Sequence, residues 1–391
     1  MIVMRIAYVL NATIPTGGAT KAFMSMLRGV ISLGVTPVVV MPDCGGIFGD
    51  LKAMGVECYA FTFRARTYPN FSTFKEKIFF LPRIIARLVV NHLAIHTLIG
   101  ILRQKNVDLV HTNVGVVNIG YKAAHKLNIP HLYHIREYGD LDFHYHYFPC
   151  PHSFYQQLQQ SDCFTVCITR DIQRHHGLSS SPLSRVVYDS IRPTEPSYPQ
   201  VCYGNYFLYA GRVQYTKGLD LLLKAYVLCL KKGVKLLPLW VAGDLLDMNY
   251  LGQVQQYIRE HDLRDEVTFL GPRSDIEELM AGARALVVPS RYEGFGLCMP
   301  EAMFNGCLVI AHDTAGTHEQ LENGLRETGE EIALRFQTTE QLAACLEKVS
   351  AASRDEFLPM IQRAFSVVNR LYTVEAHAHQ IYQYYQDILS L

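Results

Sequence analysis

This sequence predicts an α/β protein made of two doubly wound domains that face each other across a cleft. The chain has 391 residues, which is too long for one ordinary α/β core and suits two domains of roughly 150–200 residues each. Short apolar segments alternate with helical patterns in two separate sets, which is typical of parallel sheets covered by helices. A proline-rich stretch at residues 193–200 separates the two sets.

The first domain is expected to span residues 1–194. Its strands are predicted at residues 6–10, 36–41, 109–111, 131–134 and 164–168. The second domain is expected to span residues 203–371, with strands at residues 207–210, 237–242, 267–270, 285–288 and 308–311. Residues 372–391 carry apolar side chains at helical spacing and predict a final helix. In such open sheets ligands bind at the carboxyl ends of the strands, so a site is expected there.

Two acids frame the turn after the expected strand at residues 285–288. Residues 291–301 read Arg-Tyr-Glu-Gly-Phe-Gly-Leu-Cys-Met-Pro-Glu and place Glu293 and Glu301 eight positions apart. Gly294 and Gly296 allow a sharp turn and a close approach to a ligand. Pro300 and Glu301 fit the first turn of a helix, where free backbone amides favour a phosphate. This stretch therefore indicates a binding site.

A second polar loop follows the expected strand at residues 207–210. It contains Gly211, Arg212, Lys217 and Gly218, and a helical pattern begins directly after it. The planar guanidinium of Arg212 can bind phosphate oxygens through two hydrogen bonds, and Lys217 adds a mobile charge near the helix start. Two cations and two carboxylates on loops of one sheet indicate a site for a nucleoside diphosphate.

With these residues, the chain resembles the retaining glycosyltransferases of family 4, which have the GT-B fold of two Rossmann-like domains. Their Glu-x7-Glu pattern is matched by Glu293 and Glu301, and their Gly-Arg-x4-Lys-Gly pattern is matched by residues 211–218. Weaker matches are the glycine loop at residues 15–21, the segments 108–111 and 267–271, and residues 315–319 before Asn323-Gly324. The resemblance spans nearly the whole length of the chain.

The resemblance implies a retaining hexosyltransferase that needs no metal and no cofactor besides its nucleotide sugar. The donor would bind the second domain, and the acceptor the first. The final helix, 372–391, would pack back on the first domain. Catalytic roles fall on Glu293 near the donor sugar and on Arg212 and Lys217 at the diphosphate, whereas Glu301 would bind ribose. The remaining donor-binding positions implied are Gly17, Gly18, Gly211, Gly294, Phe295, Gly296 and Leu297.

The segment after Pro130 departs from the usual family pattern, in which a strand ends in a histidine that faces the sugar. Counting without gaps places Arg136 at that position, with His134 two residues earlier. Because side chains alternate along a strand, both belong to the same face. We expect at least one of them to line the cleft, and which one contacts the sugar stays open. A core histidine is the alternative for His134.

Composition excludes several classes of protein. Lys and Arg number 36 and so do Asp and Glu, so net charge gives no reason to expect nucleic acid as a partner. The ten cysteines include no pair at two-residue spacing, which indicates reduced thiols and a cytoplasmic protein. The apolar strand pattern starts directly after Arg5, so we expect no signal peptide.

Residues 74–102 are apolar but interrupted by Lys75, Lys77, Arg83, Arg87 and two histidines. Charges recur too often for a span of about 20 apolar residues. Two interpretations stay open. The segment forms ordinary helices packed on the first sheet, or it forms a basic, aromatic-tipped helix lying on the inner face of the cytoplasmic membrane, which would suit a lipid-linked acceptor.

The predicted reaction moves a hexose from a UDP or GDP sugar to a glycan or lipid-linked glycan. Assembly of cell-envelope, capsular or other polysaccharides and glycoconjugates is the expected pathway. A nucleotide-sugar epimerase of related fold and a non-enzymatic sugar-nucleotide sensor are the alternatives. Asp140 and Asp142 resemble an Asp-x-Asp metal motif, but they lie in a different context, so no metal site is predicted. His144, His146 and His152 lack a matching ligand set.

Overall fold

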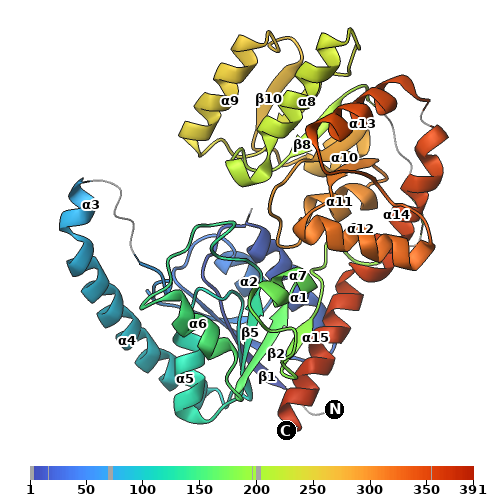
Figure 1. Cartoon of the computed structure of the whole chain (residues 1–391). Coiled ribbons are helices and arrows are strands. Elements are labelled where there is room, and N and C mark those ends of the chain that lie inside the picture. Colours follow the sequence, from blue (N-terminus) through green and yellow to red (C-terminus); the bar gives the residue numbers. More distant parts are fainter. Residues whose placement is uncertain (1–3, 16, 69–73, 196, 200–203, 354) are drawn as a thin grey trace. The chain divides into compact units, whose positions relative to one another are not determined.

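The computed structural model describes residues 4–391 except 16, 69–73, 196, 200–203 and 354. The chain divides into two compact units. Unit 1 comprises residues 1–192 and 374–391, and unit 2 comprises residues 193–373. Each unit contains one parallel sheet with helices around it (Figure 1). The predicted α/β class with two doubly wound sheets is therefore confirmed, whereas the cleft between them stays a prediction.

Unit 1 is built on a seven-stranded sheet in the order β3-β2-β1-β4-β5-β6-β7. Its strands are β1 (Arg5–Val9), β2 (Thr36–Met41), β3 (Glu57–Ala60), β4 (Leu109–Thr112), β5 (His131–Ile135), β6 (Cys163–Cys167) and β7 (Ser184–Val186). Its helices are α1 (Gly18–Ser32), α2 (Phe48–Ala53), α3 (Phe74–Ile78), α4 (Phe80–Gln104), α5 (Ile119–Leu127), α6 (Pro151–Leu158), α7 (Arg170–His175) and α15 (Val374–Leu389).

Unit 2 is built on a six-stranded sheet in the order β10-β9-β8-β11-β12-β13. Its strands are β8 (Phe207–Ala210), β9 (Leu239–Ala242), β10 (Val267–Gly271), β11 (Ala285–Val288), β12 (Val309–His312) and β13 (Leu334–Phe336). Its helices are α8 (Leu219–Lys231), α9 (Met248–Glu260), α10 (Ile276–Gly282), α11 (Cys298–Phe304), α12 (Ala315–Thr328), α13 (Thr339–Ala351) and α14 (Leu358–Leu371). It also contains the 3-10 turns η1 (Tyr215–Lys217) and η2 (Asp355–Phe357).

Both sheets reverse their direction of growth at one point. In unit 1 the chain moves outward from β1 through β2 to β3, and then returns to place β4 on the other side of β1. Unit 2 repeats this pattern, with β11 on the other side of β8. The loops after the two strands at such a switch point diverge to opposite sides and leave a crevice, where ligands of doubly wound proteins bind. The fold therefore directs attention to the loops after β8 and β11.

The last helix belongs to unit 1 although the whole of unit 2, residues 193–373, precedes it in the chain. Helix α15 packs against α1, and Gly29 makes this approach possible, because a side-chain carbon there would lie 2.5 Å from Cβ of Ala378. Tyr385 of α15 reaches the sheet, where its hydroxyl lies 2.6 Å from Nδ1 of His111. The C-terminal helix thereby covers part of the unit 1 core.

Candidate functional site

The polar residues predicted in unit 2 lie on the loops after the neighbouring strands β8 and β11. These strands pair in parallel, with Ala285 beside Phe207 and Leu286 beside Leu208, so both loops leave the same edge of the sheet. Glu293 lies in the second loop and is buried, with 7% of its surface exposed. Its Oε1 accepts hydrogen bonds from Nζ of Lys217 at 2.7 Å and from Oγ of Ser290 at 2.8 Å. The two loops are thus joined by a shielded ion pair.

The approach of these loops depends on Gly218, which separates η1 from α8. Its φ angle is +69°, in the left-handed region that side chains disfavour. A Cβ at this position would lie 2.0 Å from the carbonyl oxygen of Pro289 in the other loop. The backbone N–H of Arg291 also donates to the carbonyl of Thr216 at 2.8 Å. Glycine at position 218 therefore lets the Lys217 loop lie directly against the Glu293 loop.

We expect Gly218→Ala to destabilise unit 2 by more than about 2 kcal/mol, since the added carbon meets a backbone carbonyl and the backbone is also strained. Gly233→Ala is the matched control, because Gly233 has a φ of +74° with nothing within 4 Å of the added carbon. That change should cost only about 1 kcal/mol. Urea unfolding followed by the fluorescence of Trp240, the only tryptophan, reports on unit 2. Equal losses in both variants would contradict the proposed crowding.

Arg212 and Glu301 lie in the same neighbourhood. Burial raises the pKa of Tyr209 well above its usual range, and the nearby charge of Glu293 raises it further, whereas Arg212 acts in the opposite direction. Burial also raises the pKa of Cys298, which lies within electrostatic reach of Glu293, Lys217 and Glu301. Arg212 is exposed, and the Tyr209 hydroxyl holds its backbone carbonyl at 2.9 Å. The two predicted cations and two predicted carboxylates therefore gather at one end of the sheet.

The glycines and apolar residues of the Glu293 loop shape its backbone. Gly296 has a φ of +83°, and Leu297 precedes the first turn of α11. The buried Phe295 ring packs edge-to-face against Tyr372 at 5.1 Å, so this side chain supports the loop from within. Gly294 is half-buried, as is Gly211 in the other loop.

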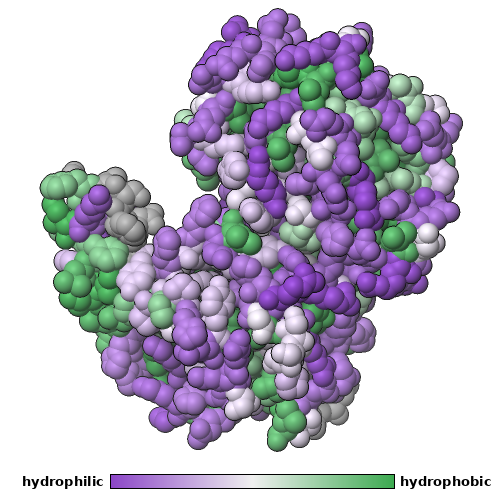
Figure 2. Space-filling view, viewed as in Figure 1, coloured by the Kyte–Doolittle hydropathy of each residue, from purple (hydrophilic) through white to green (hydrophobic). Residues whose placement is uncertain are grey.

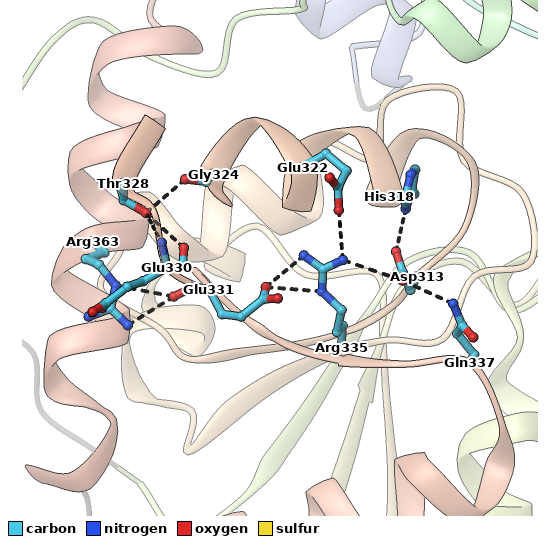
Figure 3. Close-up of polar contacts among 10 residues, drawn as sticks. All are labelled: Asp313, His318, Glu322, Gly324, Thr328, Glu330, Glu331, Arg335, Gln337 and Arg363. Atoms are coloured by element: carbon cyan, nitrogen blue, oxygen red, sulfur yellow. Dashed lines mark hydrogen bonds and ion pairs between the residues drawn. The ribbon is translucent and has the colours of Figure 1, made fainter. Parts of the chain in front are cut away.

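Helix α12 closes a third side of this loop. The N–H of Gly316 donates to the carbonyl of Glu293 at 2.9 Å, and a side-chain carbon at Gly316 would lie 2.5 Å from the Gly294 carbonyl oxygen. A network around Arg335 fixes α12 to the end of the sheet (Figure 3). Arg335 donates to Glu322 at 2.9 Å and to Glu331 at 2.8 Å. The contacts of Gly316 with the Glu293 loop place the amino end of α12 beside Glu293.

Two features of this site could not be read from the sequence motifs. Arg291 grips Asp220 with two hydrogen bonds of 2.8 Å, and its guanidinium stacks on the Tyr215 ring at 4.1 Å. Burial alone would raise the pKa of Asp220, but the hydrogen bonds from Arg291 and Tyr250 lower it to about 2. Ser290, the second feature, is the hydroxyl donor to Glu293. In the sequence, only the position of Ser290 directly before residues 291–301 indicates a role for it.

In unit 1, Gly17 and Gly18 mark the start of α1 after β1. Gly17 caps the helix without any side-chain hydrogen bond, and the first turn carries no acid. A side-chain carbon at Gly17 would meet only ordinary contacts, at 3.4 Å or more, so packing does not require glycine there. Gly18 is exposed. The predicted role of this loop toward a ligand stays a prediction.

His134 and Arg136 belong to a buried polar network. Nδ1 of His134 lies 3.2 Å from Nε2 of His111 and 3.3 Å from Nη2 of Arg136. Arg136 also forms an ion pair with Asp189, and both side chains are at least 95% buried. Burial lowers the pKa of His134 well below its usual value, so its ring is neutral. His134 thus occupies the position of a core histidine, and contact of either residue with a sugar stays a prediction.

The acidic and histidine-rich loop of unit 1 is held by its own contacts. Asp142 accepts hydrogen bonds from the N–H groups of Tyr138 and Gly139, and Asp140 pairs with His175. Within the part of the chain that the structure describes, no group of three or more His, Cys, Asp or Glu side chains is arranged to hold a metal ion.

Comparison with known proteins bears directly on this arrangement. Residues 203–355 match the protein family described as "Glycosyl transferases group 1". The chain is 27% identical over 188 residues to "Lipopolysaccharide core biosynthesis mannosyltransferase LpsB" of Rhizobium meliloti, which covers 46% of this chain and 50% of that protein. It is 41% identical over 78 residues to "O-antigen chain mannosyltransferase RfbU" of Salmonella typhimurium, covering 19% and 22%. The matches thus span half or less of these curated relatives.

Solved structures match over a much greater length. The structure of Anabaena Alr3699/HepE in complex with UDP and glucose covers 98% of this chain and 100% of that chain, with a TM-score of 0.74 and 18% sequence identity. At this identity the likeness shows the fold alone, and it confirms the predicted GT-B type.

Proposed function

We propose that this chain, whose residues 203–355 match the group 1 glycosyl transferases, transfers a hexose from a nucleoside diphosphate sugar to a hydroxyl acceptor. One observation carries the proposal. The contact between Lys217 and Glu293 joins the loops after β8 and β11, at the point where ligands of doubly wound sheets bind. A cation that can bind a phosphate thus lies beside a carboxylate that can accept hydrogen bonds from sugar hydroxyls.

The proposed chemistry depends on charge that develops during the reaction. As the bond between the anomeric carbon and the diphosphate oxygen breaks, negative charge grows on the departing diphosphate. Lys217 and Arg212 stabilise that charge, and fixed groups of this kind contribute strongly because they need no reorganisation. Glu293, held by Lys217 and Ser290, is a rigid acceptor that orients the donor sugar. Glu301, in the first turn of α11, is assigned to the ribose hydroxyls.

Retention at the anomeric carbon follows from the family resemblance. The acceptor oxygen forms its bond to that carbon on the face from which the diphosphate leaves. The acceptor proton passes to a departing phosphate oxygen, so the reaction needs no covalent sugar–enzyme intermediate. Unit 2 binds the donor in this scheme, and unit 1 binds the acceptor.

We further propose a glycan or lipid-linked glycan acceptor and a role in the assembly of cell-envelope polysaccharides. The names of the matched relatives, which concern the lipopolysaccharide core and the O-antigen chain, support this class of acceptor. A cytoplasmic location is part of the proposal. The nine cysteines that the structure describes are free thiols, which suits a reducing compartment.

Thermal unfolding with UDP, GDP and their sugar derivatives tests donor binding. A ligand at about 100 times its Kd stabilises the folded protein by roughly 2.7 kcal/mol, so the cognate nucleotide should raise the midpoint clearly. UDP is the first choice, because the HepE structure contains it. Arg212→Ala should weaken nucleotide binding by about 10- to 100-fold and lower transfer as well, since it removes charge-assisted hydrogen bonds to the diphosphate.

Arg259→Ala is the matched control, because Arg259 is an exposed arginine on α9 of the same unit. It should leave both nucleotide binding and transfer unchanged. The proposal fails if no nucleoside diphosphate shifts the midpoint, or if the two arginine variants behave alike. Conversion of a sugar nucleotide in the absence of any acceptor would instead indicate an epimerase.

A further inference from the structure

Helices α3 and α4 present an apolar face to solvent at one side of unit 1. Leu81, Ile85, Leu88, Val89 and Leu93 of α4 are between 49% and 64% exposed. The face continues onto the preceding turns, where Phe74, Ile78 and Phe79 are between 56% and 79% exposed. Figure 2 shows hydrophobic atoms gathered over this helix pair. We call these eight residues the α3–α4 face. Such a concentrated apolar surface marks an interaction site.

The face lies N-terminal to the part of α4 that packs onto its own unit. The buried apolar residues of α4 lie toward its C-terminal end, at Ala94, Ile95, Leu98, Ile101 and Leu102, where the helix contacts α5. At 100° per residue Leu81 and Leu88 lie within about 60° of the buried Ile95 and Leu102, so the exposed face continues the buried stripe of α4 toward its N-terminal end. An apolar stripe that runs beyond the packed part of a helix and stays exposed is typical of an interaction surface.

The same segment carries a local positive charge. Residues 64–105 contain eight basic residues (Arg64, Arg66, Lys75, Lys77, Arg83, Arg87, Arg103 and Lys105) and one acid, Glu76, so their net charge is 8 − 1 = +7. The whole chain has a formal net charge of zero. Lys77 is exposed at the edge of the α3–α4 face. Arg66 and Arg87 hydrogen-bond within unit 1 and Lys105 pairs with Glu57, so exposed residues such as Arg64 and Lys77 carry the charge that complements an anionic surface.

Packing opposes a helix that spans the membrane. Helix α4 is the one described helix long and apolar enough to cross a membrane, and 22% of its most apolar window is buried. A span needs about 20 residues in hydrocarbon. Leu98, Ile101 and Leu102 near the C-terminal end of α4 are buried against protein, and Asn91 exchanges two hydrogen bonds with the backbone of Arg64, at 2.8 and 3.0 Å. Insertion across a bilayer would break these contacts, whereas a helix lying in the surface keeps them.

A second copy of the chain fits the face less well. Ile78, Leu81, Ile85 and Leu88 follow the alternating three- and four-residue spacing of a helix pair. Val89 and Leu93 widen the exposed face beyond the narrow seam that one partner helix covers. Pairing would also bring together two segments of +7 charge, and like charges repel. An anionic bilayer covers a broad apolar face and attracts the charge.

We propose that the α3–α4 face binds the surface of an anionic lipid bilayer, with α4 lying in the plane of the interface. Its leucine and isoleucine side chains enter the boundary between headgroups and acyl chains, and exposed basic residues such as Lys77 face lipid phosphates. The inference stands apart from sugar transfer, because it concerns where the protein is held and not which reaction it performs.

Co-sedimentation of the purified full chain with lipid vesicles tests this site. Vesicles of phosphatidylcholine alone are compared with vesicles containing about one third phosphatidylglycerol, which carry a negative surface potential. The protein should bind the anionic vesicles, and added salt should weaken binding. The variant Leu81→Gln, Ile85→Gln, Leu88→Gln should bind at least about tenfold more weakly, because it removes apolar area while glutamine keeps the helix stable.

The variant Leu246→Gln, Met248→Gln is the matched control, since these residues of unit 2 are 82% and 71% exposed. It should bind vesicles as the unchanged protein does. Lys77→Gln should weaken binding to anionic vesicles about fivefold and leave phosphatidylcholine unaffected. Nucleotide-induced thermal shifts should be the same in all variants, which separates this proposal from the donor site. Absence of vesicle binding, equal loss in the control, or a dimer that only the triple variant dissociates would overturn the assignment.

Discussion

Replacing Glu293 with glutamine is expected to lower sugar transfer by roughly 10²–10³-fold while nucleotide affinity changes little. The change keeps the shape of a buried side chain, removes its charge and replaces one acceptor oxygen by an NH2 donor. Glu293 accepts from Lys217 and Ser290, and in the proposed reaction its carboxylate orients the sugar. The nucleotide is bound by other groups, so its Kd should stay within about threefold of the unchanged protein. Transfer is measured with the sugar nucleotide that raises the thermal unfolding midpoint most.

The contact with Lys217 makes this prediction sharper, because the two residues should act as a unit. Lys217→Met removes the cation that Glu293 holds and should also lower transfer strongly. If the pair acts together, the double variant loses much less activity than the sum of the two single losses in free energy. Additive losses would mean that the two residues act separately.

Glu347→Gln is the control for loss of an acid in unit 2, because Glu347 is an exposed residue of α13. It should retain transfer. Since breaking one partner of a buried ion pair can destabilise a protein by about 3–5 kcal/mol, unfolding of Glu293→Gln is measured in parallel. A large loss of stability with unchanged transfer in the folded fraction would assign the pair a structural role only.

The loops of this site could be predicted because their signals are local. Glycine next to a buried strand predicts a turn, and charged residues after that turn predict a polar site at the carboxyl end of the sheet. Both loops lie where these signals put them. The contact between Lys217 and Glu293 could not be predicted from periodicity, because it joins residues 76 positions apart and depends on the order of the strands.

The strands with continuous burial were predicted, and three short edge strands were missed. The central strands β4 and β5 are buried at every position, so their apolar runs are clear. Strand β3 lies at the sheet edge with only half-buried or exposed residues, and β7 and β13 have three residues each at the opposite edges. Short edge strands carry weak patterns, and none of the three was predicted.

The surroundings of His134 depended on a part of the chain that local reasoning could not place there. The alternation of side chains along a strand correctly predicted that His134 and Arg136 lie on the same side of the sheet, where they contact each other. That side is covered by α15, whose His377 ring stacks on His134 with centroids 6.0 Å apart. The helix follows the whole of unit 2 in sequence, so spacing along β5 gave no sign of it.

Unit 1 is expected to lose stability steeply as the pH falls below about 6.5, because it buries five neutral histidines. Burial lowers the pKa of His131 to about 3 and that of His176 to about 4. Burial also lowers the pKa values of His111, His134 and His377. The unfolded chain takes up protons near its ordinary histidine pKa, whereas the folded chain does not. His131 and His176 therefore each remove about 1.4 kcal/mol of stability per pH unit well below 6.5, and the other three histidines act in the same direction.

One buried acid acts in the opposite direction. Burial raises the pKa of Glu137 to about 8, so its folded form keeps a proton that the unfolded chain releases above its ordinary value of 4.5. Its contribution to stability is therefore full below pH 4.5 and is lost as the pH rises toward 8. The histidines outnumber this carboxyl, so the net stability of unit 1 should fall as the pH drops below about 6.5.

Urea unfolding at several pH values between about 7 and 5.5 checks this expectation. Far-ultraviolet circular dichroism follows both units, whereas Trp240 follows unit 2, so the transition of unit 1 should move to lower urea without an equal change in fluorescence. His131→Phe should reduce the slope of the free energy of unfolding against pH by the contribution of about one proton, because it removes a buried group whose folded pKa is about 3. His379→Gln, at an exposed position of α15, should leave the slope unchanged. If acid weakens both units equally, or if the two histidine variants have the same slope, the buried histidines do not control acid unfolding.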